Sequence, residues 1–407
     1  MHKINYSLYK TIGFLNYDEN FLKKLNQNKF IKKSYSNETN NFLDQTYYSE
    51  YLNIMFKQHE QGSFKFNKEF DIEIKIKRIN EKVKVNYIDL FIFNDPFSRE
   101  NIGIFSIDYK IENNNLNKFS DISNSLNRYE TEIIFQEKEF YLKEFISSVL
   151  LFGHDFYSEN SALNQYSGSK FKNYIVIDLE RKDLNIDNLL FEIGTCSKIN
   201  TINDSAEYAP SENYKNLILE NKISCFKNYD CLALLDSFTC IGENNYNEDN
   251  IYAYSTWSDI YHSIYIYNLY VKCCLQIISN DFGEDAMSKR DEFQQFYNKY
   301  YLNKISFNFL PNELFFGIKK GLEIKDDTEF INDRLETLAT QVNEKQQKQQ
   351  EFLLLCISII ALLETPLHLE GIREIIGINN HIIFNSVAYA LLLITVISFL
   401  IMRIRRK

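Results

Sequence analysis

Glycine and proline are scarce in this chain of 407 residues, which has 12 glycines and 4 prolines. Few glycines leave few places where the backbone can approach a phosphate closely. Neither G-x-G-x-x-G nor G-x-x-x-x-G-K-[ST] occurs, and the nearest fragment, Ser167-Gly168-Ser169-Lys170, lacks the upstream glycine. We interpret that fragment as a polar turn, so the sequence has no glycine-rich phosphate loop.

Signatures of metal and disulfide chemistry are also lacking. The seven cysteines form no C-x-x-C pair, and the six histidines are scattered along the chain. Zinc needs close Cys and His ligands, and a disulfide framework needs paired cysteines. We therefore expect reduced cysteines with ordinary structural roles, and the sequence identifies no metal ligand.

Catalytic motifs are missing as well, since neither G-x-S-x-G nor H-E-x-x-H occurs. Asp89, Asp95, Asp178 and Glu180 lie near the ends of predicted strands, and we interpret them as solvated carboxylates. The N-terminal residues contain no apolar stretch of the kind that signal peptides have. The sequence therefore predicts a protein that is not an enzyme and carries no signal peptide.

The charge balance argues against binding to nucleic acid. The chain has 45 basic and 55 acidic residues, of which residues 351–407 hold only five and four, so residues 1–350 carry a net charge of −11. Contacts to phosphate backbones need clustered Lys and Arg. No direct binding to DNA or RNA is expected.

Residues 1–310 mix strand and helix patterns. Three runs that alternate in polarity or are rich in β-branched residues predict an antiparallel meander over residues 71–78, 82–94 and 102–111. Helical patterns cover residues 128–151, 256–278 and 285–301. The sequence predicts an α+β sensor domain with an antiparallel sheet, followed by a helical stalk region at residues 311–350.

The segment Ile251–Tyr270 is the best candidate for a ligand site in this domain. It contains the only tryptophan and several tyrosines, whose faces stack on purines, together with hydroxyls that orient phosphate or ribose. The candidate ligand-binding residues are Tyr254, Trp257, Ser258, Asp259 and His262. The alternative is a packed, aromatic-rich helix that Ser255 or Thr256 caps.

The C-terminal region predicts a membrane hairpin. Residues 382–402 are 21 consecutive uncharged residues, enough for a helix to cross about 30 Å of hydrocarbon, and a basic cluster follows them. The apolar run at residues 352–363 is shorter, but a helix over residues 351–369 would return both ends of the chain to the cytoplasm. We therefore expect two transmembrane helices within residues 351–407, at about 351–369 and 382–402.

Polar residues inside a span favour assembly around an axis, because such groups avoid lipid. Ser358, Leu362 and Thr365 share one face of the first expected span, and Glu364 adjoins Thr365. These four are the candidate pore-lining residues. Ser358 could instead bond its own helix backbone.

One long helix is predicted upstream of this span. Ile331, Leu335, Leu338 and Val342 follow a 4-3-4 spacing, and no Gly or Pro occurs between Glu323 and Pro366. The helix is either a solvated segment or a continuous stalk that lines an oligomer axis.

The order of these parts resembles the CorA-like magnesium channel superfamily, which has an α/β cytoplasmic domain, a stalk helix, two spans and a basic tail. The Gly-Met-Asn signature of that family is missing, since the corresponding position reads Thr365-Pro366-Leu367-His368. Members of the family are homopentamers. The resemblance therefore implies a homopentamer in the cytoplasmic membrane, with several spans and both termini in the cytoplasm.

Divergent CorA-like proteins without this signature accompany type III CRISPR systems, and the chain looks like that branch. The likeness implies a membrane channel or effector of antiviral defence that a nucleotide second messenger activates, such as an S-adenosylmethionine–AMP conjugate or a cyclic oligoadenylate. One alternative is a divalent-cation transporter with altered selectivity, for which Mg²⁺ would be the permeant ion. Another is a membrane-anchored binding protein without a pore.

Overall fold

The computed structural model describes residues 3–57, 63–94, 101–112, 114–157, 168–180, 185–202, 209–226, 229–243, 255–280 and 286–376, with a few further positions between 382 and 394. Contacts within the chain divide it into two compact units, Met1–Asp333 and Arg334–Lys407.

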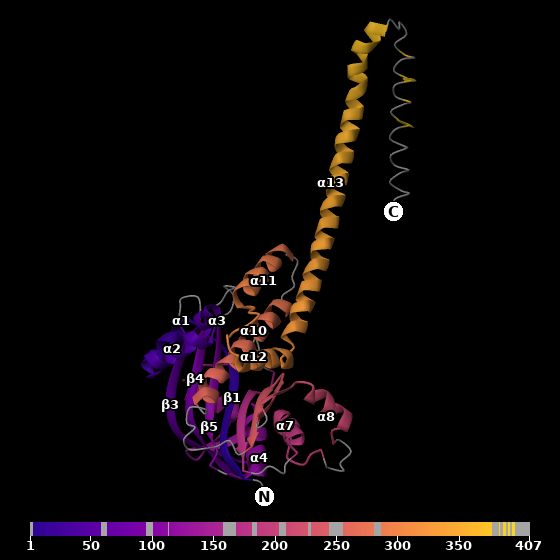
Figure 1. Ribbon diagram of the computed structural model, residues 1–407. Helices are drawn as coiled ribbons and strands as arrows, with labels where there is room; N and C mark the ends of the chain where they lie inside the picture. Colours follow the sequence, from indigo (N-terminus) through magenta and orange to yellow (C-terminus); the bar gives the residue numbers. More distant parts are fainter. Residues whose placement is uncertain are drawn as a thin grey trace. The chain divides into compact units, whose positions relative to one another are not determined.

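An 11-stranded mixed sheet forms the centre of the first unit (Figure 1). The strands are β1 (Ile4–Asn16), β2 (Ile31–Lys32), β3 (Ser63–Ile76), β4 (Glu81–Phe93), β5 (Ile102–Lys110), β6 (Glu132–Phe135), β7 (Lys138–Tyr141), β8 (Lys172–Leu179), β9 (Lys222–Phe226), β10 (Tyr229–Leu234) and β11 (Ser237–Glu243).

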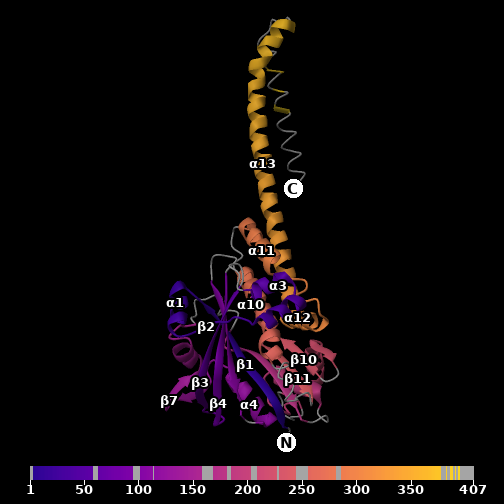
Figure 2. The ribbon, with the colours of Figure 1, turned by 60° about the vertical axis from the view of Figure 1, so that its left-hand side comes forward.

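Helices of the α and π types surround this sheet, and the last of them continues into the second unit (Figures 1 and 2). They are α1 (Glu19–Gln27), α2 (Asn37–Thr46), α3 (Ser49–Met55), α4 (Leu116–Leu126), α5 (Leu142–Phe145), η1 (Ile146–Leu150), α7 (Ile186–Gly194), α8 (Glu212–Leu219), η3 (Thr256–Tyr261), α10 (His262–Asn280), α11 (Ala286–Tyr300), α12 (Phe309–Gly321) and α13 (Ile324–Ile376).

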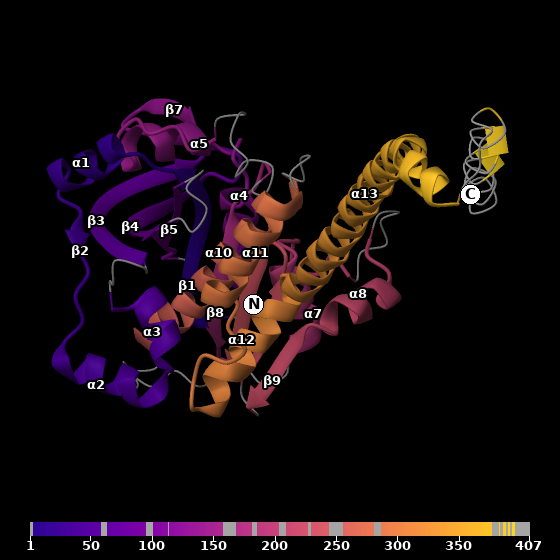
Figure 3. The ribbon, with the colours of Figure 1, turned by 90° about the horizontal axis from the view of Figure 1, so that it is seen from above.

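The strand order is β7-β6-β3-β4-β5-β1-β8-β11-β10-β9, with β2 on β3, and its middle part can be followed in Figure 3. The predicted meander is confirmed, because β3 pairs with β4 and β4 with β5, both antiparallel. The prediction of an antiparallel sheet is wrong for the sheet as a whole, because β8 and β11 run parallel. Parallel neighbours need a long crossover, and here the connection carries α7, α8 and the β9–β10 pair.

Helices pack on both faces of the sheet, and strand alternation assigns side chains to each face. Tyr9 of β1 donates its hydroxyl to the carbonyl of Ser123 in α4 at 3.1 Å. The next residue, Lys10, points to the opposite face and donates to the carbonyl of Ser258 in η3 at 2.9 Å. Because both faces are covered, all of β8 is buried, as is most of β1.

Helix α13 is continuous over 53 residues, so the long helix predicted after Glu323 is confirmed. The predicted transmembrane hairpin is wrong, because no helix among the described residues is long and apolar enough to cross a bilayer. The first expected span, residues 351–369, is part of α13, where a short apolar run lies between Gln- and Lys-rich turns and Glu364. Most of the second expected span, residues 382–402, lies outside the described residues.

The absence of a membrane-spanning helix among the described residues also overturns the predictions that depended on the transmembrane hairpin. The CorA-like fold class with two transmembrane helices is not supported. The classification as a membrane protein and ion channel, and the location in the cytoplasmic membrane with several spans, are corrected for the same reason.

Candidate anion-binding pocket

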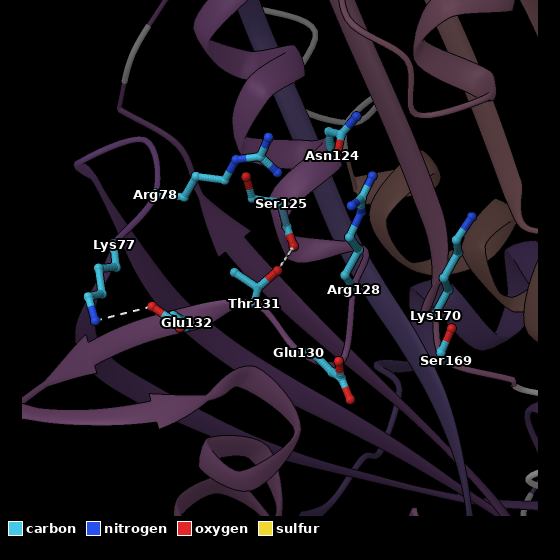
Figure 4. Close-up of a pocket in the computed structure, with 10 residues that line it drawn as sticks. All are labelled: Lys77, Arg78, Asn124, Ser125, Arg128, Glu130, Thr131, Glu132, Ser169 and Lys170. Carbon is cyan, nitrogen blue, oxygen red and sulfur yellow. Dashed lines mark hydrogen bonds and ion pairs between the residues drawn. The ribbon is translucent and has the colours of Figure 1, made fainter.

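A pocket of about 880 Å³ opens beside the β3–β4 turn and the C-terminal end of α4 (Figure 4). Its lining is rich in cationic and hydroxyl- or amide-bearing side chains. The lining residues are Lys77, Arg78, Asn124, Ser125, Arg128, Glu130, Thr131, Glu132, Ser169 and Lys170. We call this site the basic pocket.

The β3–β4 turn brings two of the cations to the pocket. The chain reverses over residues 77–80, with Asn80 at a φ of 59°, a conformation that Asn tolerates better than most residues. The amide of Lys77 donates to the carbonyl of Glu132 at 3.0 Å, which fixes the turn against β6. In Figure 4 the Arg78 side chain extends toward Ser125 and Asn124.

Arg128 and Lys170 come from segments far apart in the sequence that pair as an isolated antiparallel bridge. Flanking backbone bonds hold this pairing, since Tyr129 donates to Ser169 at 3.2 Å and Phe171 donates to Asn127 at 2.8 Å. Figure 4 shows the Arg128 and Lys170 side chains running in the same direction. Like charges directly opposite each other are destabilising, so this pair carries an electrostatic cost that a bound anion would offset.

The positive charge of the basic pocket is only partly neutralised. Lys77 forms ion pairs with Glu132 at 3.1 Å and Glu139 at 2.9 Å. Within the part of the chain that the structure describes, Arg78, Arg128 and Lys170 have no acidic partner within 4.0 Å. These three cations therefore remain available to a ligand.

A second polar cluster lies on the opposite side of the sheet, beneath η3, and we call it the buried ion chain. Lys33 contacts Asp259 at 2.6 Å, Asp259 contacts Lys65 at 2.8 Å, and Lys65 contacts Asp89 at 3.1 Å. Asp89 also lies 3.7 Å from Lys10. In the register of β1 and β5, Lys10 is directly opposite Asp108. Three ammonium groups and three carboxylates thus alternate from the half-buried Lys33 into the core.

The charged groups of the buried ion chain shift one another's pKa values. Burial lowers the pKa of Lys65, but the charges of Asp259 and Asp89 outweigh burial and raise that pKa overall. Burial also opposes ionisation of Asp259, yet Lys65 and Lys33 hold its pKa below the usual range. Burial lowers the pKa of Lys10 and raises that of Asp108. Asp259 and Lys65 are therefore ionised together at neutral pH.

The residues expected to bind a ligand in Ile251–Tyr270 mostly have internal partners. The carbonyls of Trp257 and Ser258 accept from Tyr174 at 2.8 Å and from Lys10, and Asp259 belongs to the buried ion chain. His262 is fully buried, with Nε2 at 3.1 Å from the Ser106 hydroxyl. Burial, reinforced by the nearby lysines, lowers the His262 pKa. Tyr254 lies outside the described residues.

Trp257 lines a separate and mostly apolar cavity of about 220 Å³. The structure therefore places Ser258, Asp259 and His262 in the packing between η3, α10 and the sheet, in keeping with the packed-helix alternative. Ser255 precedes η3 without a side-chain capping bond.

The expected pore-lining residues all belong to α13. The Ser358 hydroxyl donates to the Leu354 carbonyl at 2.7 Å, which is the backbone contact considered as its alternative role. The side chains of Leu362, Glu364 and Thr365 lie outside the described residues.

Sequence reasoning missed both clusters. Asp89 and Asp178 were expected to be solvated, yet both are buried. A usable signal was Lys10, a charged residue among the apolar residues Leu8, Tyr9 and Ile12 of β1, because buried charges are normally paired. The Ser167-Gly168-Ser169-Lys170 fragment does contain a turn, with Gly168 at a φ of 59°, and it supplies Ser169 and Lys170 to the basic pocket.

Comparison of this chain with protein-family models, curated proteins and solved structures finds no match. No metal site emerges either, since no three His, Cys, Asp or Glu side chains in the described part of the chain form a group suited to a metal ion.

Proposed function

We propose that the first unit is a sensor domain that binds a small phosphate-bearing ligand of nucleotide size in the basic pocket. The observation that carries this proposal is the convergence of Arg78, Arg128 and Lys170, which have no acidic partner within the described residues, on one 880 Å³ pocket. This convergence occurs although residues 1–350 carry a net charge of −11. Ligand pockets commonly have volumes of about 300–1,000 Å³.

The pocket offers two kinds of recognition. The guanidinium groups of Arg78 and Arg128 suit the bidentate binding of phosphate, and Lys170 supplies a further point charge. Asn124 and Ser169 carry amide and hydroxyl groups that can bond a ribose or a base edge. A ligand with more than one negative charge would relieve the repulsion between Arg128 and Lys170.

A purely structural role explains only part of this arrangement. Arg128 closely follows α4, and a cation at a helix C-terminus interacts favourably with the helix dipole. That role does not account for Lys170 directly opposite Arg128, since a second cation there adds repulsion. A binding function accounts for both residues.

Isothermal titration of the full chain with ATP, AMP, pyrophosphate and adenosine tests the proposal. We expect the three phosphate-bearing probes to bind and adenosine to bind far more weakly. The variant Arg128→Ala/Lys170→Ala should lose binding. The variant Arg290→Ala/Lys304→Ala, which removes two exposed cations that do not line the pocket, should not. No binding by any phosphate-bearing probe, or equal loss in both variants, would contradict the proposal.

A second part of the proposed function is self-association through α13. Phe352, Leu354, Ile357 and Ile360 are each more than half exposed and lie on different sides of the helix. A helix that is apolar all round is normally buried, and another copy of the same helix presents a matching apolar surface. The sensor would then be a homo-oligomer, and light scattering of the full chain that gives a monomer mass would contradict this.

A further inference from the structure

Strands β10 and β11 lie side by side and form a hairpin (Figure 2). Their register places two cysteines, Cys231 and Cys240, directly opposite each other. The strands are joined by the two-residue turn Leu235–Asp236, which the pair Leu234 and Ser237 flanks. The pair Cys231 and Cys240 lies three positions further along the two strands. Cross-strand partners in this relation project to the same face of the sheet.

The turn determines the type of this pair. In a two-residue hairpin the flanking pair, here Leu234 and Ser237, exchanges backbone hydrogen bonds, and the two pair types then alternate along the ladder. Counting from the turn, Cys231 and Cys240 form a non-hydrogen-bonded pair. In such pairs the Cα atoms are about 4.5 Å apart, which lies within the range that a disulfide spans.

The surroundings provide a route for a small reagent. Cys231 lines the 220 Å³ cavity together with Trp257, Tyr229 and Tyr261. Cys240, directly opposite Cys231 on β11, is fully buried. Cys225 lines the same cavity and is more exposed than Cys231, so it provides an internal comparison. A molecule of the size of hydrogen peroxide fits this space.

Electrostatics makes this pair slow to react. Burial raises the pKa of the Cys240 thiol, and its hydrogen bond with Cys231 raises that pKa further. Only the thiolate reacts as a nucleophile, so oxidation should be slow at neutral pH and faster in alkaline solution.

We propose that Cys231 and Cys240 form a reversible redox modification site that a small hydroperoxide oxidises to a cross-strand disulfide. The proposal does not depend on ligand binding in the basic pocket, because it rests on a different hairpin and a different cavity. Cβ atoms across a strand pair are about 4.5–5.5 Å apart, somewhat more than a disulfide prefers. The bond should therefore be strained and easily reduced, as regulatory disulfides are.

The chemistry is balanced in two steps. The Cys231 thiolate attacks one peroxide oxygen, so an S–O bond forms, the O–O bond breaks, and the departing hydroxide takes up a proton to leave as water. The Cys240 sulfur then attacks the Cys231 sulfenic acid, an S–S bond forms, and the hydroxyl group leaves as a second water. Two thiols are oxidised to one disulfide while one hydrogen peroxide is reduced to two waters.

Peptide mapping of the full wild-type chain tests this proposal without any substitution. The protein is treated with hydrogen peroxide, alkylated under denaturing conditions and digested without reduction. We expect a cross-linked peptide pair that contains Cys231 and Cys240, and its loss after treatment with dithiothreitol. Persistence of both residues as free thiols under conditions that oxidise Cys225 would overturn the proposal, as would a Cys225–Cys231 linkage.

Two variants then separate this site from general oxidation. Cys225→Ser should leave the Cys231–Cys240 linkage intact. Cys240→Ser should leave Cys231 as a sulfenic acid that dimedone traps, because the resolving thiol is gone. Formation of the linkage only in alkaline denaturant would also overturn the proposal, since the native geometry would then play no part.

Discussion

Replacement of Asp89 by Asn should show how far the buried ion chain stabilises the first unit. The Asp89 carboxylate lies 3.1 Å from the Lys65 ammonium and 3.7 Å from that of Lys10, and it accepts from Asn67 at 2.8 Å. Its side chain is only 3% exposed. Asn has nearly the same shape, so the substitution removes the charge and leaves the packing largely unchanged.

The expected cost follows from what remains after the change. Lys10 and Lys65 stay buried with one compensating carboxylate fewer, and removal of one partner from a buried ion pair typically costs about 3–5 kcal/mol. Asp259 and Asp108 still face these lysines, which favours the lower end of that range. We predict that Asp89→Asn lowers the free energy of unfolding by about 3 kcal/mol.

Urea unfolding followed by fluorescence measures this change. Trp257 is the only tryptophan and lies two residues from Asp259, so its fluorescence reports on the region around the buried ion chain. Urea is preferable to guanidinium chloride, because a salt screens the charges under study. Glu73→Gln is the control, since Glu73 and Lys82 form a 2.6 Å pair on neighbouring strands but are 60% and 66% exposed. That change should destabilise the protein far less than Asp89→Asn, because solvent screens an exposed pair.

A loss of stability for Asp89→Asn that is no larger than the loss for the exposed control would refute a stabilising role of the buried ion chain. The double variant Lys10→Met/Asp89→Asn provides a second check. Because it removes a buried cation together with its partner, we expect it to be less destabilised than the sum of the two single variants. Additive losses would show that the two groups do not interact.

Two further predictions concern a single lysine and α13. Burial lowers the pKa of Lys319 to about 8. Between pH 8 and the ordinary lysine pKa of about 10.4, Lys319 binds a proton in the unfolded chain but not in the folded chain. This residue therefore makes the free energy of unfolding rise with pH in that range. In urea unfolding, Lys319→Met should make this rise of stability with pH smaller. An identical pH slope would contradict the assignment. In α13, Leu354→Glu should lower the mass measured by light scattering toward that of a monomer, whereas the control Gln346→Glu should not. The same mass for both variants would rule out association through the apolar run.

Local patterns in the sequence predicted some of the local elements, but the helix predicted over residues 128–151 is wrong in its first part, which forms β6 and β7. The alternation in residues 71–111 predicted the β3–β4–β5 meander, and the absence of Gly and Pro between Glu323 and Pro366 predicted the long helix α13. These elements were predictable because the hydrophobic period and the helix-breaking residues Gly and Pro determine local structure within a few residues. The same patterns led to error where an apolar run was extended across Glu364 to the length of a bilayer span.

Both polar clusters depend on contacts that no local pattern encodes. Lys65 and Asp259 are 194 residues apart in the sequence, and Lys10 and Ser258 are 248 apart. The basic pocket likewise combines the β3–β4 turn with Arg128 and Lys170. Such sites follow from strand order, and the parallel placement of β11 beside β8 could not be read from the chain. The resemblance to CorA-like proteins, and a link to antiviral defence, stay predictions.

The central claim is that the basic pocket binds a phosphate-bearing ligand, and the affinity of ATP for two forms of the full chain tests it most directly. Loss of one charge-assisted contact should weaken binding about tenfold, because each tenfold corresponds to about 1.4 kcal/mol. Arg128→Ala/Lys170→Ala should therefore bind ATP about a hundredfold more weakly than the wild type. Equal ATP affinity in the two proteins would contradict the assignment of this pocket.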